Sequence, residues 1–240
     1  MKLFGIIGKS LQHSFSPDYF NAKFQKLNLP DRYETFELST IAQFPDLIKR
    51  QKLLRGLNVT IPYKSDVIPF LNEIDGVAKT IGAVNTIVVK DGRTHGFNTD
   101  VIGFNKTLKS LGIRDGKALV LGSGGVSKAV QHVLQNRAIS FEVVSRDNTS
   151  NLRYEDVSDK LIQNSSLIIN CTPLGMWPNI KDTPQLPYKI LTPDHILIDL
   201  IYTPRVTTFL QHGLKRGCRV KNGYEMLISQ AEASWRIWNE

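Results

Sequence analysis

Two polar segments of this sequence end on residues whose side chains exchange protons. NVTIPYK (residues 58–64) ends on Lys64, and GFNTD (residues 96–100) ends on Asp100. Both segments include or follow short apolar runs, so an amine, a carboxylate, amides and hydroxyls gather where strands end. This density of hydrogen-bonding groups suits a small polyhydroxylated substrate better than a packed core. The pattern therefore indicates an enzyme.

Composition sets wide limits on the rest of the molecule. The 240 residues, 41% of them hydrophobic, can bury the core of one large α/β domain or of two smaller ones. The apolar runs fall far below the roughly 20 residues that a membrane span requires, and residues 1–10 do not read as a signal peptide. Cys171 and Cys218 lack metal-ligand spacing, so we expect reduced thiols, a cytoplasmic protein and no metal site.

The net charge of +8 favours anionic partners. Lysines and arginines are scattered along the chain rather than gathered into a stripe with interleaved aromatic residues, so we expect no nucleic-acid and no membrane partner. A small carboxylate substrate or a phosphorylated cofactor fits the charge equally well. A solvated basic surface without a specific ligand is the simpler interpretation.

The first half of the chain has the pattern of an α/β domain. Ser16 and Pro17 are expected as N-cap and first residue of a helix that lasts to about Leu27. Asp91 and Gly92 are typical of a hairpin turn. The expected strands are residues 3–7, 32–36, 55–59, 84–89 and 93–97.

The second half begins with a connecting helix near residues 101–111 and continues with almost continuously apolar strands. Such strands suit a parallel sheet that is buried on both faces, with helical crossovers between its strands. This is a doubly wound pattern. The expected strands are residues 117–121, 141–144, 167–170 and 196–201.

A glycine-rich turn follows the first of these strands. The chain reads GSGGVSKA (residues 122–129) and then becomes helical to about Gln135. Strand, glycine turn and helix form the context in which a backbone approaches a pyrophosphate at a helix start. Ser127 replaces the third glycine of the strict fingerprint and is small enough for close helix packing. A dinucleotide site is expected, with a plain strand-to-helix turn as the simpler interpretation.

The end of the next strand bears on which dinucleotide binds. It reads Ser145, Arg146, Asp147. A guanidinium group can bind a 2′-phosphate bidentately, which favours NADP over NAD. Asp147 either repels that phosphate or orients Arg146, and a surface arginine without a ligand is the simpler interpretation.

A series of motifs, taken together in order and spacing, resembles the shikimate dehydrogenase family from Gly5 nearly to the end of the chain. No single motif is specific, whereas the ordered set is. The motifs are HSFSP (13–17), NVTIPYK (58–64), GAVNT (82–86), GFNTDVIG (96–103), GSGGVSKA (122–129), NCTPLGM (170–176), DLIYTP (199–204) and GYEMLISQ (223–230).

The resemblance implies an α/β fold of two domains with the active site in the cleft between them. Residues 1–100 would form the substrate-binding catalytic domain, completed by a C-terminal helix at about 224–240, and residues 101–223 a Rossmann-type NADP-binding domain. The implied reaction is the reversible reduction of 3-dehydroshikimate to shikimate with NADPH, a step of the shikimate pathway to chorismate and the aromatic amino acids. The protein would be a monomer or homodimer without a metal.

Site residues are implied by matching the motifs position by position. Lys64 and Asp100 would form the catalytic pair, Ser14 and Ser16 would bind the substrate carboxylate, and Asn58 would support that site. The substrate-binding set is Ser14, Ser16, Asn58, Thr60, Lys64, Asn85, Asp100, Tyr202 and Gln230. The cofactor-binding set is Gly122, Ser123, Gly124, Gly125, Val126, Ser145, Arg146, Thr172, Met176, Leu200 and Gly223. Met226 would line the same cleft, with core packing as the simpler interpretation.

Elementary chemistry agrees with these roles. Hydride reduction of a ketone generates an alkoxide, so the site needs a group that delivers a proton and stabilises the developing charge. Lys64 is the natural donor, and Asp100 can orient it. Taken singly, Lys64 is a solvated lysine, Asp100 a helix cap, and Asn58 and Thr60 turn residues; the ordered combination favours a site.

The sequence departs from the family in three places. SRD (residues 145–147) stands where the family has an NRT-like string, which leaves NAD use open. The chain ends at Glu240, where relatives continue with a further helical segment, and Trp235 or Trp238 is expected to cover the apolar surface instead. Residues 146–151 lack the family's helical continuation and are expected to form a mobile loop beside the adenine.

Two other functions stay open. Quinate-preferring relatives have the same architecture but carry Thr or Gly at the position of Ser16, so Ser16 favours shikimate. A noncatalytic shikimate-binding module would be expected to lose Lys64, Asp100 or the glycine turn, and all three are present.

Overall fold

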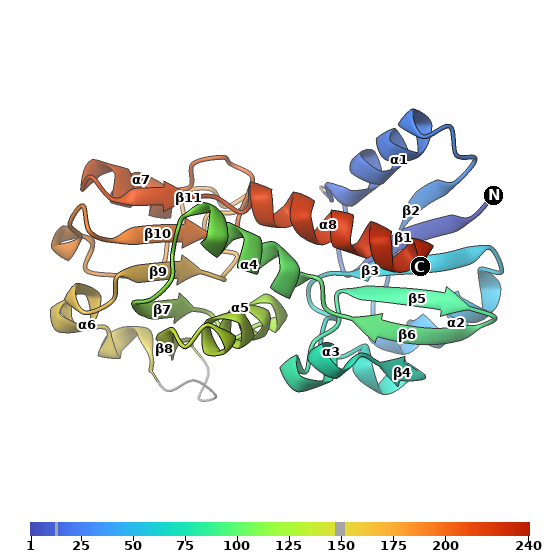
Figure 1. Cartoon of the computed structure of the whole chain (residues 1–240), viewed down its shortest axis with the longest axis horizontal. Coiled ribbons are helices and arrows are strands. Elements are labelled where there is room, and N and C mark those ends of the chain that lie inside the picture. Colours follow the sequence, from blue (N-terminus) through green and yellow to red (C-terminus); the bar gives the residue numbers. More distant parts are fainter. Residues whose placement is uncertain (13, 147–151) are drawn as a thin grey trace. The chain divides into compact units, whose positions relative to one another are not determined.

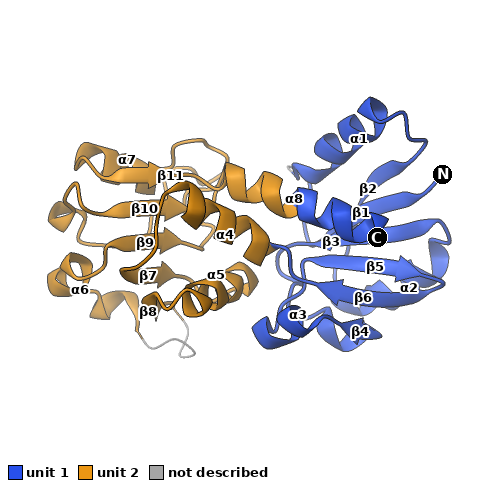
Figure 2. Ribbon diagram, in the orientation of Figure 1, with its two compact units in different colours: residues 1–99, 231–240 blue, residues 100–230 orange. Residues whose placement is uncertain are grey.

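The computed structural model of the chain describes residues 1–12, 14–146 and 152–240. These residues form two compact units, Met1–Thr99 with Ala231–Glu240 and Asp100–Gln230 (Figure 2). Each unit contains its own sheet, which confirms the expected α/β class. The assignment of substrate binding to one unit and cofactor binding to the other stays a prediction. Among the described residues, none of the helices combines the length and the apolar character that crossing a membrane would need.

A six-stranded mixed sheet forms the centre of the first unit, with strand order β2-β1-β3-β5-β6-β4. β1 is parallel to β2 and β3, β5 is antiparallel to β3 and β6, and β4 is parallel to β6. The strands are β1 (Leu3–Gly8), β2 (Arg32–Glu37), β3 (Leu54–Val59), β4 (Glu73–Ile74), β5 (Thr86–Lys90) and β6 (Arg93–Phe97). The helices are α1 (Ser16–Lys26), α2 (Phe44–Arg50) and α3 (Gly76–Ile81), with 3₁₀ turns η1 (Ile41–Gln43) and η2 (Ile68–Phe70).

The β5–β6 hairpin is confirmed. Asp91 and Gly92 both have positive φ, 51° and 76°, as a type I′ turn requires. The expected strand start at residue 84 is wrong, because β5 begins at Thr86. The amide of Val84 donates to the Lys64 carbonyl at 2.7 Å instead of to a neighbouring strand.

The expected cap of α1 is wrong by one residue. Phe15 is the N-cap residue and Ser16 is the first helical residue, followed by Pro17. Within the described residues, this N-cap makes no side-chain capping hydrogen bond. Ser16 is only 7% exposed.

The C-terminal helix α8 (Tyr224–Asn239) contributes its residues 231–239 to the first unit, which also includes Glu240. Trp238 is 7% exposed, and its ring centroid lies 5.1 Å from that of Phe4 and 5.2 Å from that of Phe20. Its indole nitrogen donates to the Ile87 carbonyl at 3.1 Å. The structure thus places Trp238 in the aromatic core of this unit.

A five-stranded, wholly parallel sheet forms the second unit, with strand order β11-β10-β9-β7-β8 (Figure 1). Separate apolar clusters cover its two faces, so the expectation of a parallel sheet buried on both faces is confirmed. The strands are β7 (Lys117–Leu121), β8 (Ser140–Val144), β9 (Leu167–Asn170), β10 (Ile196–Asp199) and β11 (Arg219–Lys221). The helices are α4 (Asp100–Ser110), α5 (Gly125–Asn136), α6 (Asp159–Gln163) and α7 (Thr208–Lys215), with 3₁₀ turns η3 (Tyr154–Asp156) and η4 (Tyr188–Ile190).

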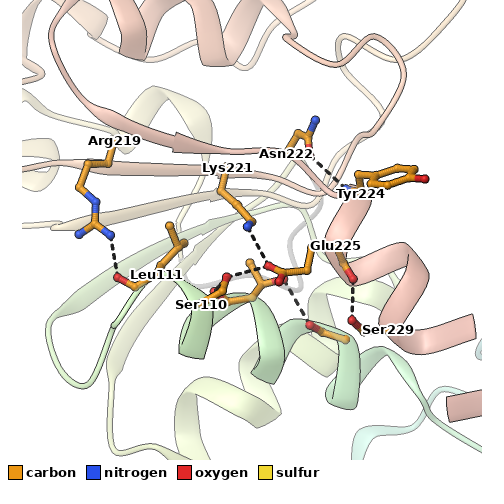
Figure 3. Close-up of polar contacts among 10 residues, drawn as sticks. Ser110, Leu111, Arg219, Lys221, Asn222, Tyr224, Glu225 and Ser229 are labelled. Carbon is orange, nitrogen blue, oxygen red and sulfur yellow. Dashed lines mark hydrogen bonds and ion pairs between the residues drawn. The ribbon is translucent and has the colours of Figure 1, made fainter. Parts of the chain in front are cut away.

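The start of α8 is fixed within the second unit by polar contacts (Figure 3). Glu225 forms an ion pair with Lys221 at 2.8 Å and accepts a hydrogen bond from Ser110, the last residue of α4, at 2.7 Å. The side chain of Asn222 accepts from the amide of Tyr224 at 3.2 Å. These contacts join β11, α4 and α8 around Gly223.

Candidate active site

Predicted substrate-binding residues of the first unit lie at strand ends. In the ladder, Asn58 is paired with Ile6 of β1 and Thr86 of β5. The Asn58 side-chain nitrogen donates to the Asn85 carbonyl at 3.2 Å, and these two asparagines are 5% and 2% exposed. Thr60 follows β3 directly, and its amide donates to the Ile7 carbonyl at 3.0 Å. The structure therefore brings Asn58 and Asn85 together, with Thr60 at the end of the same strand.

A buried network of side chains surrounds these asparagines. Asn58 also donates to the Ser234 hydroxyl at 3.1 Å. The Ser234 oxygen lies 2.7 Å from the hydroxyl of Thr86 and 3.2 Å from that of Thr99. The side-chain oxygen of Asn85 accepts from the Thr99 amide at 2.7 Å. Thr86 and Thr99 stand in the GAVNT and GFNTD motifs, whereas nothing in the sequence pattern pointed to Ser234.

Lys64 lies in the turn between β3 and η2. Its carbonyl accepts the Val84 amide, and the Tyr63 amide closes the turn by donating to the Thr60 carbonyl at 3.0 Å. The Lys64 side chain is half-buried. The backbone of this turn is thus held at both sides, which fixes the point from which the Lys64 side chain extends.

The serines of the HSFSP motif differ in burial. Ser14 is half-buried, and its amide donates to the Leu11 carbonyl at 3.0 Å. Ser16 is buried at the start of α1, near the phenol of Tyr33. His13 of the same motif lies outside the described residues. Tyr33 was not singled out from the sequence.

The glycine turn of the second unit has the geometry of an anion site. Gly122 follows β7 with a φ of +103°, and a Cβ atom there would lie 3.1 Å from the methyl group of Thr172. Among the described residues, nothing lies within 4 Å of a Cβ position at Gly124, and this N-cap of the 12-residue helix α5 makes no side-chain capping hydrogen bond. Helix amides and open space next to them suit a phosphate. Ser123 lies in this turn, and Gly125 and Val126 are the first two residues of α5.

Ser127 takes the place of a third glycine without disturbing the turn. Its side chain is fully buried, and its hydroxyl donates to the Gly122 carbonyl at 2.6 Å. The serine therefore fastens the helix start to the end of β7.

The carboxyl ends of β9 and β10 are joined by a buried network that the sequence analysis missed. Asn170 accepts hydrogen bonds from the Thr172 amide and hydroxyl at 3.0 and 2.6 Å, and donates to Asp199 at 3.1 Å. Asp199 also accepts from the Ile201 amide at 3.0 Å and the Thr207 hydroxyl at 2.5 Å. Because the Ile201 amide is used in this way, β10 ends at Asp199, and the expected strand end at residue 201 is wrong.

Leu200 and Gly223 lie against each other. A Cβ atom at Gly223 would lie 2.1 Å from the Leu200 carbonyl oxygen, so only glycine fits. The Gly223 amide donates to the Ile201 carbonyl at 3.0 Å. Tyr202 follows in the same loop and is half-buried.

Further along the C-terminal helix, Met226 is part of the apolar core of the second unit. This agrees with the simpler interpretation of that residue. Gln230 is half-buried one turn later, and its side-chain nitrogen donates to the Leu227 carbonyl at 3.0 Å.

Asp100, the predicted partner of Lys64, is the first residue of α4 and is 4% exposed.

The predicted contacts for the adenosine part of a dinucleotide differ in exposure. Ser145 is 4% exposed and its amide donates to the Leu152 carbonyl at 3.1 Å, whereas Arg146 is exposed. Burial raises the pKa of Tyr154 to about 12, and the nearby positive charge of Arg146 opposes that shift. Met176 is 42% exposed in the loop after β9. Asp147 and the rest of the expected loop, residues 148–151, lie outside the described residues.

The described residues contain no group of three or more His, Cys, Asp or Glu side chains that could hold a metal ion. Cys171 and Cys218 are free cysteines, and burial raises the pKa of both thiols. A raised pKa disfavours the nucleophilic thiolate.

Protonation of Asp199 is expected to stabilise the fold in mild acid. Burial raises the pKa of this carboxyl from 3.8 to about 6, against its hydrogen bonds from Thr207, Ile201 and Asn170. Protonation of the Asp199 carboxyl therefore stabilises the fold fully at pH values below the pKa of this group in the unfolded chain. That contribution is lost as the pH rises through the pKa of the same group in the folded protein. A shift of this size corresponds to about 3 kcal/mol.

The Asp199→Asn variant isolates this effect because it cannot titrate. Between neutral pH and about pH 4, the free energy of unfolding of the wild type should rise relative to that of the variant by up to about 3 kcal/mol. Denaturant titrations of both proteins at the two pH values measure the difference. An equal difference at both pH values would show that Asp199 does not titrate in this range.

Three comparisons place the chain among known proteins. A family model described as the shikimate dehydrogenase substrate binding domain matches residues 6–87. A protein of Clostridium beijerinckii named shikimate dehydrogenase (NADP(+)) is 40% identical over 255 residues, which cover 100% of this chain and 93% of the relative. The crystal structure of shikimate dehydrogenase 1 from Peptoclostridium difficile is similar with a TM-score of 0.88 at 35% identity and covers 100% of this chain and 92% of that one. The Thermus thermophilus shikimate 5-dehydrogenase in complex with NADP(H) and shikimate has a TM-score of 0.88 at 31% identity, with 99% and 93% covered.

Proposed function

Because the chain belongs to the shikimate dehydrogenase family, we propose that it catalyses the reversible, NADPH-dependent reduction of 3-dehydroshikimate to shikimate. This is a step of the shikimate pathway, which leads to chorismate and the aromatic amino acids. The observation that carries the proposal is the turn after β7, where Gly122 has positive φ and α5 begins without a side-chain cap among the described residues. Such a turn fits a dinucleotide pyrophosphate.

The second unit is proposed to hold NADP. A bound NADPH would supply the hydride for the reduction. The amides of the glycine turn would bind the pyrophosphate, and the exposed guanidinium of Arg146 would bind the 2′-phosphate. Leu200 and Gly223, which lie in contact, would pack beside the nicotinamide. The full proposed set is Gly122, Ser123, Gly124, Gly125, Val126, Ser145, Arg146, Thr172, Met176, Leu200 and Gly223.

The substrate is proposed to be held by hydroxyl and amide groups. Ser14 and Ser16 would donate to its carboxylate, since a carboxylate only accepts hydrogen bonds. Asn58 would support this site from within the buried network. The remaining proposed contacts are Thr60, Lys64, Asn85, Asp100, Tyr202 and Gln230.

Lys64 and Asp100 are proposed to handle the proton. In the direction of reduction, the ammonium group of Lys64 would donate to the oxygen that becomes the new hydroxyl, and in the reverse direction the amine would take that proton back. Asp100 would orient the ammonium group. The half-buried position of Lys64 on a fixed turn supports this role.

Kinetics on the purified protein test the proposed function. We expect consumption of NADPH that depends on 3-dehydroshikimate, a lower kcat/KM with NADH, and oxidation of shikimate in preference to quinate. Equal rates with quinate would instead favour a quinate/shikimate dehydrogenase, and faster NADH turnover would contradict the cofactor assignment. Shikimate binding without turnover with either cofactor would favour a noncatalytic binding module.

We further propose that the enzyme works in the cytoplasm, as a monomer or homodimer, without a metal and without a nucleic-acid or membrane partner. Two free, buried or half-buried thiols support a reducing compartment. Light scattering of the purified protein measures its oligomeric state.

A further inference from the structure

Tyr33 occupies an unusual place in the first unit. It lies on β2, it is 3% exposed, and its ring stacks on that of Phe20 with the centroids 4.8 Å apart. Its hydroxyl reaches the side chain of Asn58 at 2.7 Å. An aromatic core residue thus presents its one polar atom to the buried network rather than to solvent.

The chemistry of Asn58 determines the direction of this hydrogen bond. The side-chain nitrogen of Asn58 lies 3.2 Å from the Asn85 carbonyl, and a carbonyl only accepts. The amide oxygen of Asn58 must therefore face Tyr33, and an amide oxygen also only accepts. Tyr33 donates to Asn58, which leaves the phenol oxygen to accept from a second partner.

Ser16 lies near the same phenol. Burial raises the pKa of Tyr33 well above its ordinary value, and the nearby Ser16 side chain opposes that shift. Ser16 is 7% exposed and begins α1. The hydrogen bond that the structure gives the phenol hydroxyl is the one to Asn58 of β3.

We propose that Tyr33 is a positioning residue for substrate binding, whose hydroxyl holds the side chain of Asn58 in the orientation that supports the substrate site. The inference rests on the proposed function, since it presupposes that Asn58 serves shikimate. Without the phenol, the Asn58 oxygen loses its donor. A buried acceptor without a donor is costly, so the asparagine would reorient.

The Tyr33→Phe variant tests this role because it removes only the hydroxyl and leaves the ring on Phe20. We expect the KM for shikimate and its Kd by calorimetry to rise about tenfold, the loss expected for one hydrogen bond in a buried network. The Kd for NADP⁺ should stay unchanged, and kcat should change less than about twofold, because the hydroxyl acts on binding rather than on the proton transfer.

Thr94→Val is a matched control within the same unit. Thr94 is 3% exposed, and its hydroxyl exchanges hydrogen bonds with Asn72, at 3.1 Å each. This variant also loses a buried hydroxyl, but its affinity for shikimate should equal that of the wild type. A rise in KM in both variants would assign the effect to general destabilisation and overturn the inference.

The experiment separates this inference from the proposed function. If the wild type binds shikimate and Tyr33→Phe binds it equally well, the inference is overturned and the proposed function stands. If the wild type itself binds no shikimate, the proposed function fails, and the inference fails with it.

Discussion

Replacement of Lys64 by alanine should lower kcat by about 10²- to 10⁴-fold, the contribution typical of a positioned general acid. The KM for 3-dehydroshikimate should change far less, because the proton is needed mainly in the transition state. Steady-state rates of NADPH consumption at varied substrate concentration measure both quantities. The near-ultraviolet circular dichroism of the variant should match that of the wild type, since Lys64 is half-buried and its turn is held by backbone hydrogen bonds.

Lys79 offers a control for loss of a lysine from the same unit. It lies exposed in the last turn of α3, so the Lys79→Ala variant should keep the wild-type rate. An unchanged kcat in Lys64→Ala would remove this lysine from the mechanism. A rise in KM with kcat unchanged would assign it to substrate binding alone.

Replacement of Arg146 by alanine should change the cofactor preference. We expect the KM for NADPH to rise about tenfold to a hundredfold, because the 2′-phosphate loses a charge-assisted hydrogen bond. NADH has no phosphate at this position, so its KM should change less than about twofold. Kinetics with both cofactors at saturating 3-dehydroshikimate, together with fluorescence titration of NADPH binding, measure the difference.

The Arg93→Ala variant is the control for the loss of one positive charge from the surface. Arg93 is an exposed residue of the β5–β6 hairpin in the other unit and forms an ion pair with Glu73 at 3.0 Å. This variant should keep the wild-type preference. If Arg146→Ala weakens NADPH and NADH equally, the guanidinium does not recognise the 2′-phosphate.

Elements determined by local pattern could be predicted from the sequence. β7 and β9 have the predicted bounds, because continuous apolar runs set both their length and their burial. The hairpin at Asp91 and Gly92 follows from residues that accept positive φ. The glycine turn likewise precedes α5 as expected.

Features set by distant contacts could not be predicted. β10 ends at Asp199 because the side chain of that residue captures the Ile201 amide, and the Asn58 side chain is held by the hydroxyl of Tyr33 from β2. Both outcomes depend on partners that only the fold brings near.

The same distinction applies to the candidate site. The predicted residues Asn58 and Asn85 are in contact, as are Leu200 and Gly223. Ser234 joins the network around Asn58 from the C-terminal helix, 176 residues away in sequence. The sequence gives no sign that Tyr33 is more than a core aromatic residue, whereas in the structure its hydroxyl donates to the side-chain oxygen of Asn58. The roles of these residues in binding and catalysis stay predictions until the variants are measured.

Transfer of a labelled hydride tests the central claim most directly. The purified protein is incubated with 3-dehydroshikimate and NADPH that carries deuterium at the transferable position of the nicotinamide, and the product is analysed by mass spectrometry and NMR. We predict shikimate with deuterium on the carbon of the new hydroxyl group, and a hydroxyl proton that comes from solvent. Formation of no shikimate, or of shikimate without the label, would contradict the assignment of this chain as an NADP-dependent shikimate dehydrogenase.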